Sequence, residues 1–413
     1  MAHPLVFSLQ TYFYPIGNTT PVNLIQDIAP EESANILLLG CGDPRNIFFT
    51  LHSNTFGEKS SRTRSFVDSE PAVLARNILL FTLIIDNEPS KEDLLWNIFY
   101  DIYIDATAMR ALIQQCRKLV NLAADVSTWH ASSYGLLLRI CTQQTPFELR
   151  RLWTLYERFN DQPAGRKTTV NRAFSEVSNK SKNLFVVGSS RSAGPFHLLA
   201  TEPLSKHFQE FWSSGVHAND KNVVAKAKLI NPTFLYSNAG EGFLVHYATD
   251  AFASFHLAPA FSDTRSEHGA LPSERLPQRI SCESDSLRAM RWPSVFYYTA
   301  KLPPLPRLTR SILLTPLTFD VVDTSNLADH LGLLNILLVI SPLLSRTPHS
   351  SLYTETLLAT GSDTTRGFLE LACGDLTTIS ILLNLVPSSF VSRFNSHSNI
   401  HELALQTITD DSR

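Results

Sequence analysis

The sequence predicts an α/β fold in which a mostly parallel, doubly wound sheet carries a large helical insertion. The first observation is a short apolar run at Asn35–Leu39 that ends abruptly in a Gly-Cys-Gly turn. The second is a strand candidate at Arg64–Val67, followed by a long apolar helix candidate at Ala72–Ile85. The third is a strand candidate at Phe319–Val322 that leads through a polar turn into a helix. Buried parallel strands followed by helices are typical of doubly wound sheets.

The glycine turn after the first strand has the form of a nucleotide-type ligand site. Asp43 is suited to cap the next helix, and Pro44 suits the first helical position because its missing N–H costs nothing there. Gly40 and Gly42 let a ligand approach the backbone closely, and the helix start offers N–H groups with a partial positive charge. Gly-x-Gly also follows strands in turns that bind nothing, and this alternative stays open.

Polar residues follow the other two strand candidates as well. An acid that closes the second strand, about 20 or more residues after the glycines, is where α/β sites for dinucleotides and nucleosides hold ribose hydroxyls. Ligands of doubly wound sheets lie outside the carboxyl ends of the strands, so we expect all three turns to border one crevice. The candidate binding residues are Gly40, Gly42, Asp43, Asp68, Glu70, Asp323, Ser325 and Asn326.

The length of the chain constrains the number of domains only loosely. A chain of 413 residues allows two or three domains, or one enlarged domain. We divide it into a first half of the α/β core (1–87), a helical insertion (88–160), a mixed α/β insertion with long polar loops (161–310), and a second half of the core with C-terminal helices (311–413).

The charge balance and the cysteines argue against several function classes. A net charge of −3 gives no electrostatic case for a nucleic-acid partner. The five cysteines form no C-x-x-C pair, so we expect no zinc site, no disulfide framework and a reducing compartment. No apolar stretch reaches the ~20 residues of a membrane span, and the N-terminus lacks the features of a secretory signal. We expect a soluble protein without a membrane partner.

Further elements are predicted from periodicity. Residues 91–125 show two apolar helical faces, and Tyr134–Cys141 and Phe147–Phe159 are predicted as two more helices, the latter starting after a Thr-Pro pair. Phe368–Leu371 is a weaker strand candidate. These helices form an insertion rather than a repeat array.

Two polar segments are predicted as irregular. Ser262–Arg291 is expected to be a long surface loop or linker, and Asn160–Asn183 an exposed connection or mobile lid. The second segment contains a basic cluster that can meet an anionic partner, although a solvated loop is the favoured interpretation. Its residues are Arg166, Lys167, Arg172, Lys180 and Lys182.

Two histidines among aromatic residues are candidates for catalysis. His246 can form an acid/base pair with the nearby Asp250, and His256 lies in a similar context. No nucleophile or metal-ligand spacing accompanies them, so buried histidines satisfied by hydrogen bonds are the favoured interpretation. The sequence therefore names no catalytic residue and no metal ligand.

Several longer motifs resemble a known family. They are LLLGCGDPRNI (37–47), DSEPAVLARNILL (68–80), RSAGP (191–195), NPTF (231–234), GFLVHYATD (242–250), FHLA (255–258) and DVVDTSNLADHLGLLN (320–335). With these motifs the chain resembles fungal proteins that carry an uncharacterised N-terminal domain often accompanied by a MYND-type zinc finger. That domain is also similar to the N-terminal part of dynein axonemal assembly factor 3. The resemblance implies a cytoplasmic role in protein assembly with unidentified protein partners; no zinc-finger cysteine pattern follows.

The first two motifs also resemble the S-adenosylmethionine site of class I methyltransferases. This resemblance implies a Rossmann-like fold with Gly40 and Gly42 as loop glycines and Asp68 as the ribose acid, or else Glu70. Pro44 replaces a third glycine, and Leu38 stands where an acid normally helps fix the cofactor. Two functions follow as expectations. The favoured one is a non-catalytic interaction or assembly module, and the alternative is an active S-adenosylmethionine-dependent methyltransferase of unknown substrate.

Overall fold

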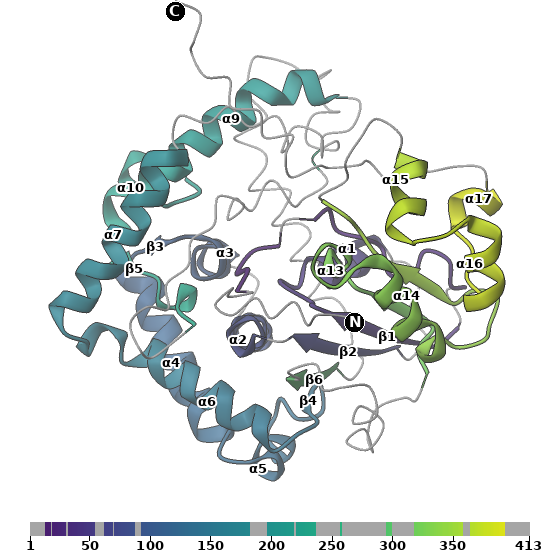
Figure 1. Cartoon of the computed structure of the whole chain (residues 1–413). Coiled ribbons are helices and arrows are strands. Elements are labelled where there is room, and N and C mark those ends of the chain that lie inside the picture. Colours follow the sequence, from purple (N-terminus) through teal and green to yellow (C-terminus); the bar gives the residue numbers. More distant parts are fainter. Residues whose placement is uncertain are drawn as a thin grey trace, which may run out of the picture.

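Figure 1 shows the chain as a computed structural model. The structure describes residues 13–17, 19–29, 32–53, 62–68, 70–86, 92–181, 196–218, 220–236, 257, 295–299, 318–357 and 364–392. His246, His256, the RSAGP motif and the predicted linker Ser262–Arg291 lie outside these ranges.

A six-stranded sheet in the order β4-β6-β2-β1-β7-β8 forms the centre of the molecule (Figure 1). Every neighbouring pair in it is parallel. A separate antiparallel pair joins β3 to β5. The strands are β1 (Ala34–Leu39), β2 (Arg62–Asp68), β3 (Tyr103–Ile104), β4 (Leu138–Ile140), β5 (Leu229–Ile230), β6 (Val295–Thr299), β7 (Val321–Asp323) and β8 (Ser351–Tyr353). The predicted α/β class with a parallel sheet is confirmed.

The central strand β1 is buried on both faces from Ile36 to Leu38, as the apolar sequence of this stretch predicts. Ile36 and Leu38 belong to the larger hydrophobic core, whereas Leu37 and the half-buried Leu39 pack in a second cluster with β7 and α14. Successive side chains of a strand point to opposite faces, so this alternation gives the sheet two covered sides.

The larger core joins one face of the sheet to a thick layer of helices (Figure 1). Its central helix is α2, in which every residue from Ala72 to Ile84 is buried. The helices of this part of the chain are α1 (Arg45–Ser53), α2 (Pro71–Asp86), α3 (Glu92–Tyr100), α4 (Ala106–Leu122), α5 (Val126–Ala131), α6 (Gln144–Glu157), η2 (Phe159–Asp161), α7 (Ala164–Ser181), α9 (His197–Ser214), α10 (Lys221–Lys226) and η4 (Pro232–Phe234).

A buried arginine joins α2 to the helical layer. Arg76 donates to Thr233 Oγ1 and to the Phe99 carbonyl, and its guanidinium stacks 4.6 Å and 4.5 Å from the centroids of the Phe99 and Phe234 rings. Burial lowers the pKa of Arg76 to about 10. Asn231 orients Thr233, because its side-chain oxygen accepts hydrogen bonds from the Thr233 N–H and hydroxyl. The arginine of the second motif and the NPTF motif are therefore explained by packing.

The other face of the sheet is covered by the C-terminal part of the chain. Gly332, at φ 84°, separates the predicted helix after β7 into two, and Asp375 caps a later one through the Thr378 N–H. The helices here are α13 (Leu327–Leu331), α14 (Leu333–Ile340), η7 (Ser341–Leu343), α15 (Thr364–Leu371), α16 (Leu376–Leu383) and α17 (Ser388–Ser392).

Three predictions about single elements are wrong, and the strands β6 and β8 were not predicted. Tyr134–Cys141 is not a helix, because Leu138–Ile140 form β4 at the sheet edge. Residues 164–181 are not a loop but the helix α7, which buries Val170 and Phe174 one turn apart. Phe368–Leu371 belong to a helix rather than a strand. Val295–Thr299 form β6, a strand that the sequence reading left unassigned. Two sheet strands thus come from segments between the two predicted halves of the core.

Candidate functional site

The strand order places a topological switch point between β1 and β7. From β1 the sheet extends through β2 and β6 to β4 on one side, and through β7 to β8 on the other. In open parallel sheets, ligands bind outside the carboxyl ends of the strands at such a point. The turns after β1 and β7, which contain six of the eight predicted binding residues, both lie there.

The two glycines of the turn after β1 adopt the left-handed conformation, which glycine tolerates better than other residues. Gly40 has φ 59° and Gly42 has φ 52°. A Cβ at Gly40 would lie 3.0 Å from Leu327 of α13, whereas a Cβ at Gly42 would meet no atom within 4 Å. The Gly42 carbonyl accepts a hydrogen bond of 2.7 Å from Asn77 of α2. Gly40 is thus required by packing, and Gly42 borders open space.

Asp43 and Arg45 form a buried ion pair at the start of α1. Arg45 Nη1 lies 3.4 Å from Asp43 Oδ1, and both side chains are at most 4% exposed. Asp43 Oδ2 also accepts the Gly17 N–H at 3.0 Å, and Arg45 Nη2 donates to Thr19 Oγ1. A Cβ at residue 17 would lie 1.3 Å from Arg45 Nη1. The N-terminal segment 13–28 therefore lies directly against the glycine turn.

The turn after β7 is tied to α1 by a second buried carboxylate. Asp323 Oδ2 accepts a hydrogen bond of 2.6 Å from Asn46, and its Oδ1 accepts the Ser325 N–H at 2.9 Å. Burial raises the pKa of Asp323, although the Ser325 N–H, Arg45 and Asn46 each act to lower it. The carboxylate is thus positioned by neighbours within the fold.

Ser325 completes a chain of contacts between α1 and the turn after β7. It has φ 46°, a left-handed conformation that costs a non-glycine residue energy. Its hydroxyl lies 3.3 Å from Thr19 Oγ1, the same atom that accepts from Arg45. Asn326 occupies the N-cap position of α13, but its side chain makes no cap hydrogen bond. Thr19 therefore links the turns after β1 and β7.

Asp68 and Glu70 have different environments. Leu39 pairs with Val67, so the parallel register places the backbone of Asp68 beside Gly40 at the same sheet edge. Glu70 accepts the Ala72 N–H at 3.2 Å, and the charged groups nearest to it are Arg151 and Glu148 of α6. Burial raises the pKa of Glu70. Glu70 therefore caps α2 next to α6 and is not part of the cluster around Asp43 and Asp323.

Glu355 is a member of this region that sequence reasoning missed. Its N–H donates to the Ser325 carbonyl at 2.8 Å. Burial, together with the charges of Asp323 and Asp329, raises its pKa to about 7, while Arg45 opposes the shift. Its position in the sequence could have identified it, because Glu355 lies two residues after the end of β8. An acidic residue that follows a strand of a parallel sheet lies at the same edge of the sheet as Asp68.

A buried histidine–carboxylate pair was also missed. His217 Nδ1 lies 3.0 Å from Asp101 Oδ1, which also accepts the His217 backbone N–H at 2.9 Å. Both side chains are almost fully buried, and the His217 ring stacks 4.0 Å from the Phe211 ring. Burial raises the pKa of Asp101, and its contacts with His217 oppose this. The pair fastens the end of α3 to the turn after α9.

Within the part of the chain that the structure describes, no group of three or more His, Cys, Asp or Glu residues is placed to hold a metal ion. None of the helices in the same ranges is long and apolar enough to cross a bilayer.

Comparisons with known proteins add one finding. A family model described as Domain of unknown function (DUF4470) matches residues 15–104. This stretch contains the segment at Gly17 and Thr19, the glycine turn, and α2, so it supports an uncharacterised N-terminal domain that includes one side of the switch point. A comparison with curated proteins gave no match, and neither did one with solved structures.

Proposed function

We propose that the chain is a non-catalytic interaction or assembly module built on a Rossmann-like, methyltransferase-like frame. The parallel sheet with its switch point, its left-handed glycines and the acid that ends β2 supports the frame. The observation that carries the proposal is that Gly17 and Thr19 of the chain's own N-terminal segment bind Asp43, Arg45 and Ser325 at the switch point.

The carboxylates at this point are already engaged, although Arg45 Nε and Nη1 make no hydrogen bond among the described residues. Asp43 accepts from Gly17 and contacts Arg45, while Asn46 donates to Asp323. A cofactor that needed these groups would have to displace buried hydrogen bonds and leave charges unpaired, which costs several kcal/mol for a buried ion pair. These groups therefore serve to fasten the N-terminal segment and β7 to α1.

The alternative is an active S-adenosylmethionine-dependent methyltransferase. Gly42 favours it, because the space beside its Cα is open, and Asp68 ends the adjacent strand at the expected place. Methyl transfer to an already nucleophilic acceptor depends mainly on positioning, so a catalytic base is not required.

Calorimetric titration of the full chain with S-adenosylmethionine and with its demethylated product separates the two functions. The proposal predicts no heat of binding and no thermal shift. Micromolar binding that disappears in Asp68→Ala and in Gly42→Val, but persists in Asp161→Ala, would establish the alternative. Asp161 is an exposed residue of η2 and provides a matched loss of one carboxylate elsewhere.

A further inference from the structure

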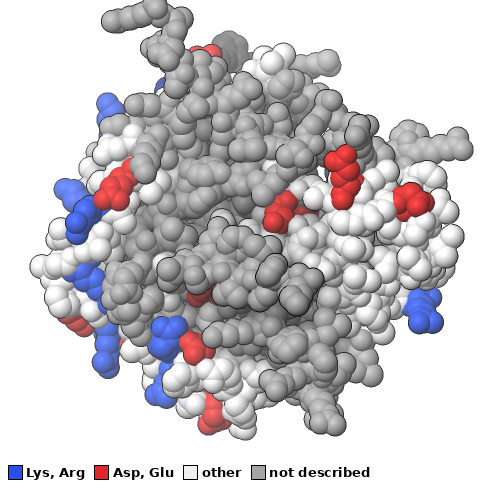
Figure 2. All heavy atoms as spheres, in the orientation of Figure 1, with Lys and Arg blue, Asp and Glu red and all other residues white. Residues whose placement is uncertain are grey.

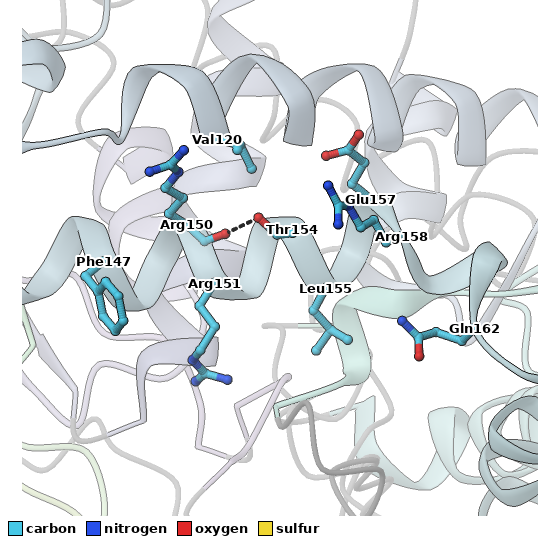
Figure 3. Close-up of a pocket in the computed structure, with 9 residues that line it drawn as sticks. All are labelled: Val120, Phe147, Arg150, Arg151, Thr154, Leu155, Glu157, Arg158 and Gln162. Carbon is cyan, nitrogen blue, oxygen red and sulfur yellow. Dashed lines mark hydrogen bonds between the residues drawn. The ribbon is translucent and has the colours of Figure 1, made fainter.

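A surface hollow of about 490 Å³ lies along α6, bordered by Val120 of α4 and by Gln162, which follows η2. Figure 3 shows its lining side chains spread along the whole length of α6, from Phe147 to Arg158. Helical neighbours recur three and four positions apart, so Phe147, Arg151 and Leu155 form one row. Arg150 and the C-cap residue Arg158 lie on the side of α6 that faces Val120 of α4 (Figure 3). We call this hollow the α6 groove.

The α6 groove combines free positive charge with neutralised charge. Arg151 lies 3.0 Å from Glu148, and Glu157 lies 2.9 Å from Arg117. Arg150 and Arg158 are exposed, and among the described residues neither has a carboxylate within ion-pair distance. Two guanidinium groups about two turns apart on one helix are therefore available to an anionic partner.

The charge of the surrounding helices strengthens this field. Residues 106–181 contain eleven Lys or Arg and five Asp or Glu, a net charge of +6 within a chain whose net charge is −3. Figure 2 shows Lys and Arg side chains gathered on the flank where Figure 1 draws α4, α6, α7 and α10. A concentrated positive surface steers and orients a complementary acidic partner.

Apolar contacts accompany the arginines. Phe147 is 62% exposed, an unusual position for a phenylalanine that follows the buried Thr145-Pro146 start of α6. Leu155 and Val120 supply buried and half-buried apolar surface in the same groove. Aromatic residues and arginines beside one another are enriched at protein-binding surfaces, where a few such residues contribute most of the affinity.

We propose that the α6 groove binds an acidic peptide segment of a partner protein. Carboxylates of the segment pair with Arg150 and Arg158, for which guanidinium groups are well suited because they can form two parallel hydrogen bonds. An apolar side chain of the segment packs against Phe147. The inference rests on the proposed function, since it names the surface through which an interaction module holds its partner.

The composition of the groove favours a peptide over RNA. Arg151 is already paired with Glu148, so the groove offers two separate free guanidinium groups, at Arg150 and Arg158, and not the continuous positive track that follows a phosphate backbone. Single-stranded nucleic acid is usually held by several aromatic side chains on which bases stack, whereas the groove contains one, Phe147. A peptide with spaced carboxylates fits this mixture.

Fluorescence anisotropy with the full chain tests the proposal. The probe is a labelled peptide in which Glu-Glu-Leu is repeated; peptides with Lys for every Glu, or Ser for every Leu, and a labelled oligouridine serve as comparisons. We expect the Glu-Glu-Leu peptide to bind best. The double variant Arg150→Glu/Arg158→Glu weakens it about tenfold or more, and Phe147→Ser weakens it by a smaller factor.

A matched control is the double variant Arg110→Glu/Arg172→Glu, which makes the same charge change at exposed positions of α4 and α7 outside the groove. We expect it to change the affinity less than about threefold, by weak long-range electrostatics. The proposal is overturned if the Glu-Glu-Leu peptide does not bind, or if both double variants weaken its binding equally. It is also overturned if the groove variant loses binding of oligouridine but not of the peptide. S-adenosylmethionine binding would refute the proposed function without changing any of these results.

Discussion

The turn after β1 and the outer face of α6 both contain several charged residues, but these are buried and paired at the turn and exposed on α6. At the turn, Asp43, Arg45 and Asp323 are buried and each contacts groups of the chain itself. On α6, Arg150 and Arg158 are exposed, and no carboxylate of the described residues pairs with them. Where a parallel sheet usually binds its ligand, the charged side chains that the structure describes contact the chain itself, whereas an open surface with unpaired arginines lies on α6.

This difference shows that a ligand-site motif and a ligand site are separate things. The glycine turn has the backbone conformation of a binding loop, but the side chains around it hold the N-terminal segment in place. Changes at the turn should therefore affect stability, whereas changes on α6 should affect binding.

The largest expected effect comes from Arg45→Ala. The variant leaves Asp43 buried without its guanidinium partner, so we expect a loss of about 3–5 kcal/mol in the free energy of unfolding. Urea denaturation measures it. A loss below about 1 kcal/mol, the size of an average substitution, would mean that the ion pair does not hold the turn.

Glu355 should make stability depend on pH. Its pKa of about 7 in the folded chain exceeds its ordinary value of 4.5, so the folded state binds a proton that the unfolded chain releases over that range. The resulting stabilisation is complete below about pH 4.5 and is lost as the pH rises towards 7, by at most about 3 kcal/mol.

Urea denaturation at several pH values checks this slope. Glu355→Gln should make this pH dependence less steep. Asp323, Asp101 and Glu70, whose pKa values are also raised, then continue to contribute with the same sign. An unchanged slope in Glu355→Gln would contradict the assignment.

Gly17→Ala is expected to have an intermediate effect. Its Cβ would overlap the Arg45 guanidinium and push it from Asp43, so we expect a loss of about 2 kcal/mol, part of the value of the pair. Gly42→Ala is the control: it adds a Cβ to open space at a left-handed position and should cost about 1 kcal/mol. Thermal denaturation of both variants shows which one loses more stability. A larger loss in Gly42→Ala than in Gly17→Ala would argue against close packing of Gly17 on the Asp43–Arg45 pair.

The smallest effect on stability is expected for Arg150→Ala. The side chain is exposed and has no ion pair among the described residues, so the free energy of unfolding should change by less than about 0.5 kcal/mol. Urea denaturation provides the value. A loss as large as that of Arg45→Ala would show that α6 uses its arginines for folding rather than binding.

The sequence predicted β1, β2 and β7 of the central sheet because their signals are local. An apolar run that ends in two glycines and leads into a capped helix needs no distant partner, and β1, β2 and α2 formed as expected. The alignment of Asp68 with Gly40 followed from the parallel arrangement. The common edge of three turns was thus predictable.

The missed elements depend on distant partners or on weak local patterns. β4 has three residues, too few for a periodic signal, and becomes a strand by pairing with β6. α7 has a polar sequence in which only Val170, Phe174 and Val177 mark a buried face. The closure of the switch point joins Thr19 to Ser325, a contact across 306 positions that no local pattern encodes.

Amide hydrogen exchange at Gly17 tests the central claim most directly. Its N–H donates to the buried Asp43 carboxylate at 3.0 Å, so we predict protection close to that of global unfolding, unchanged by added S-adenosylmethionine. Exchange as fast as that of an exposed loop would contradict the account, because the N-terminal segment would then open and leave the crevice to a ligand.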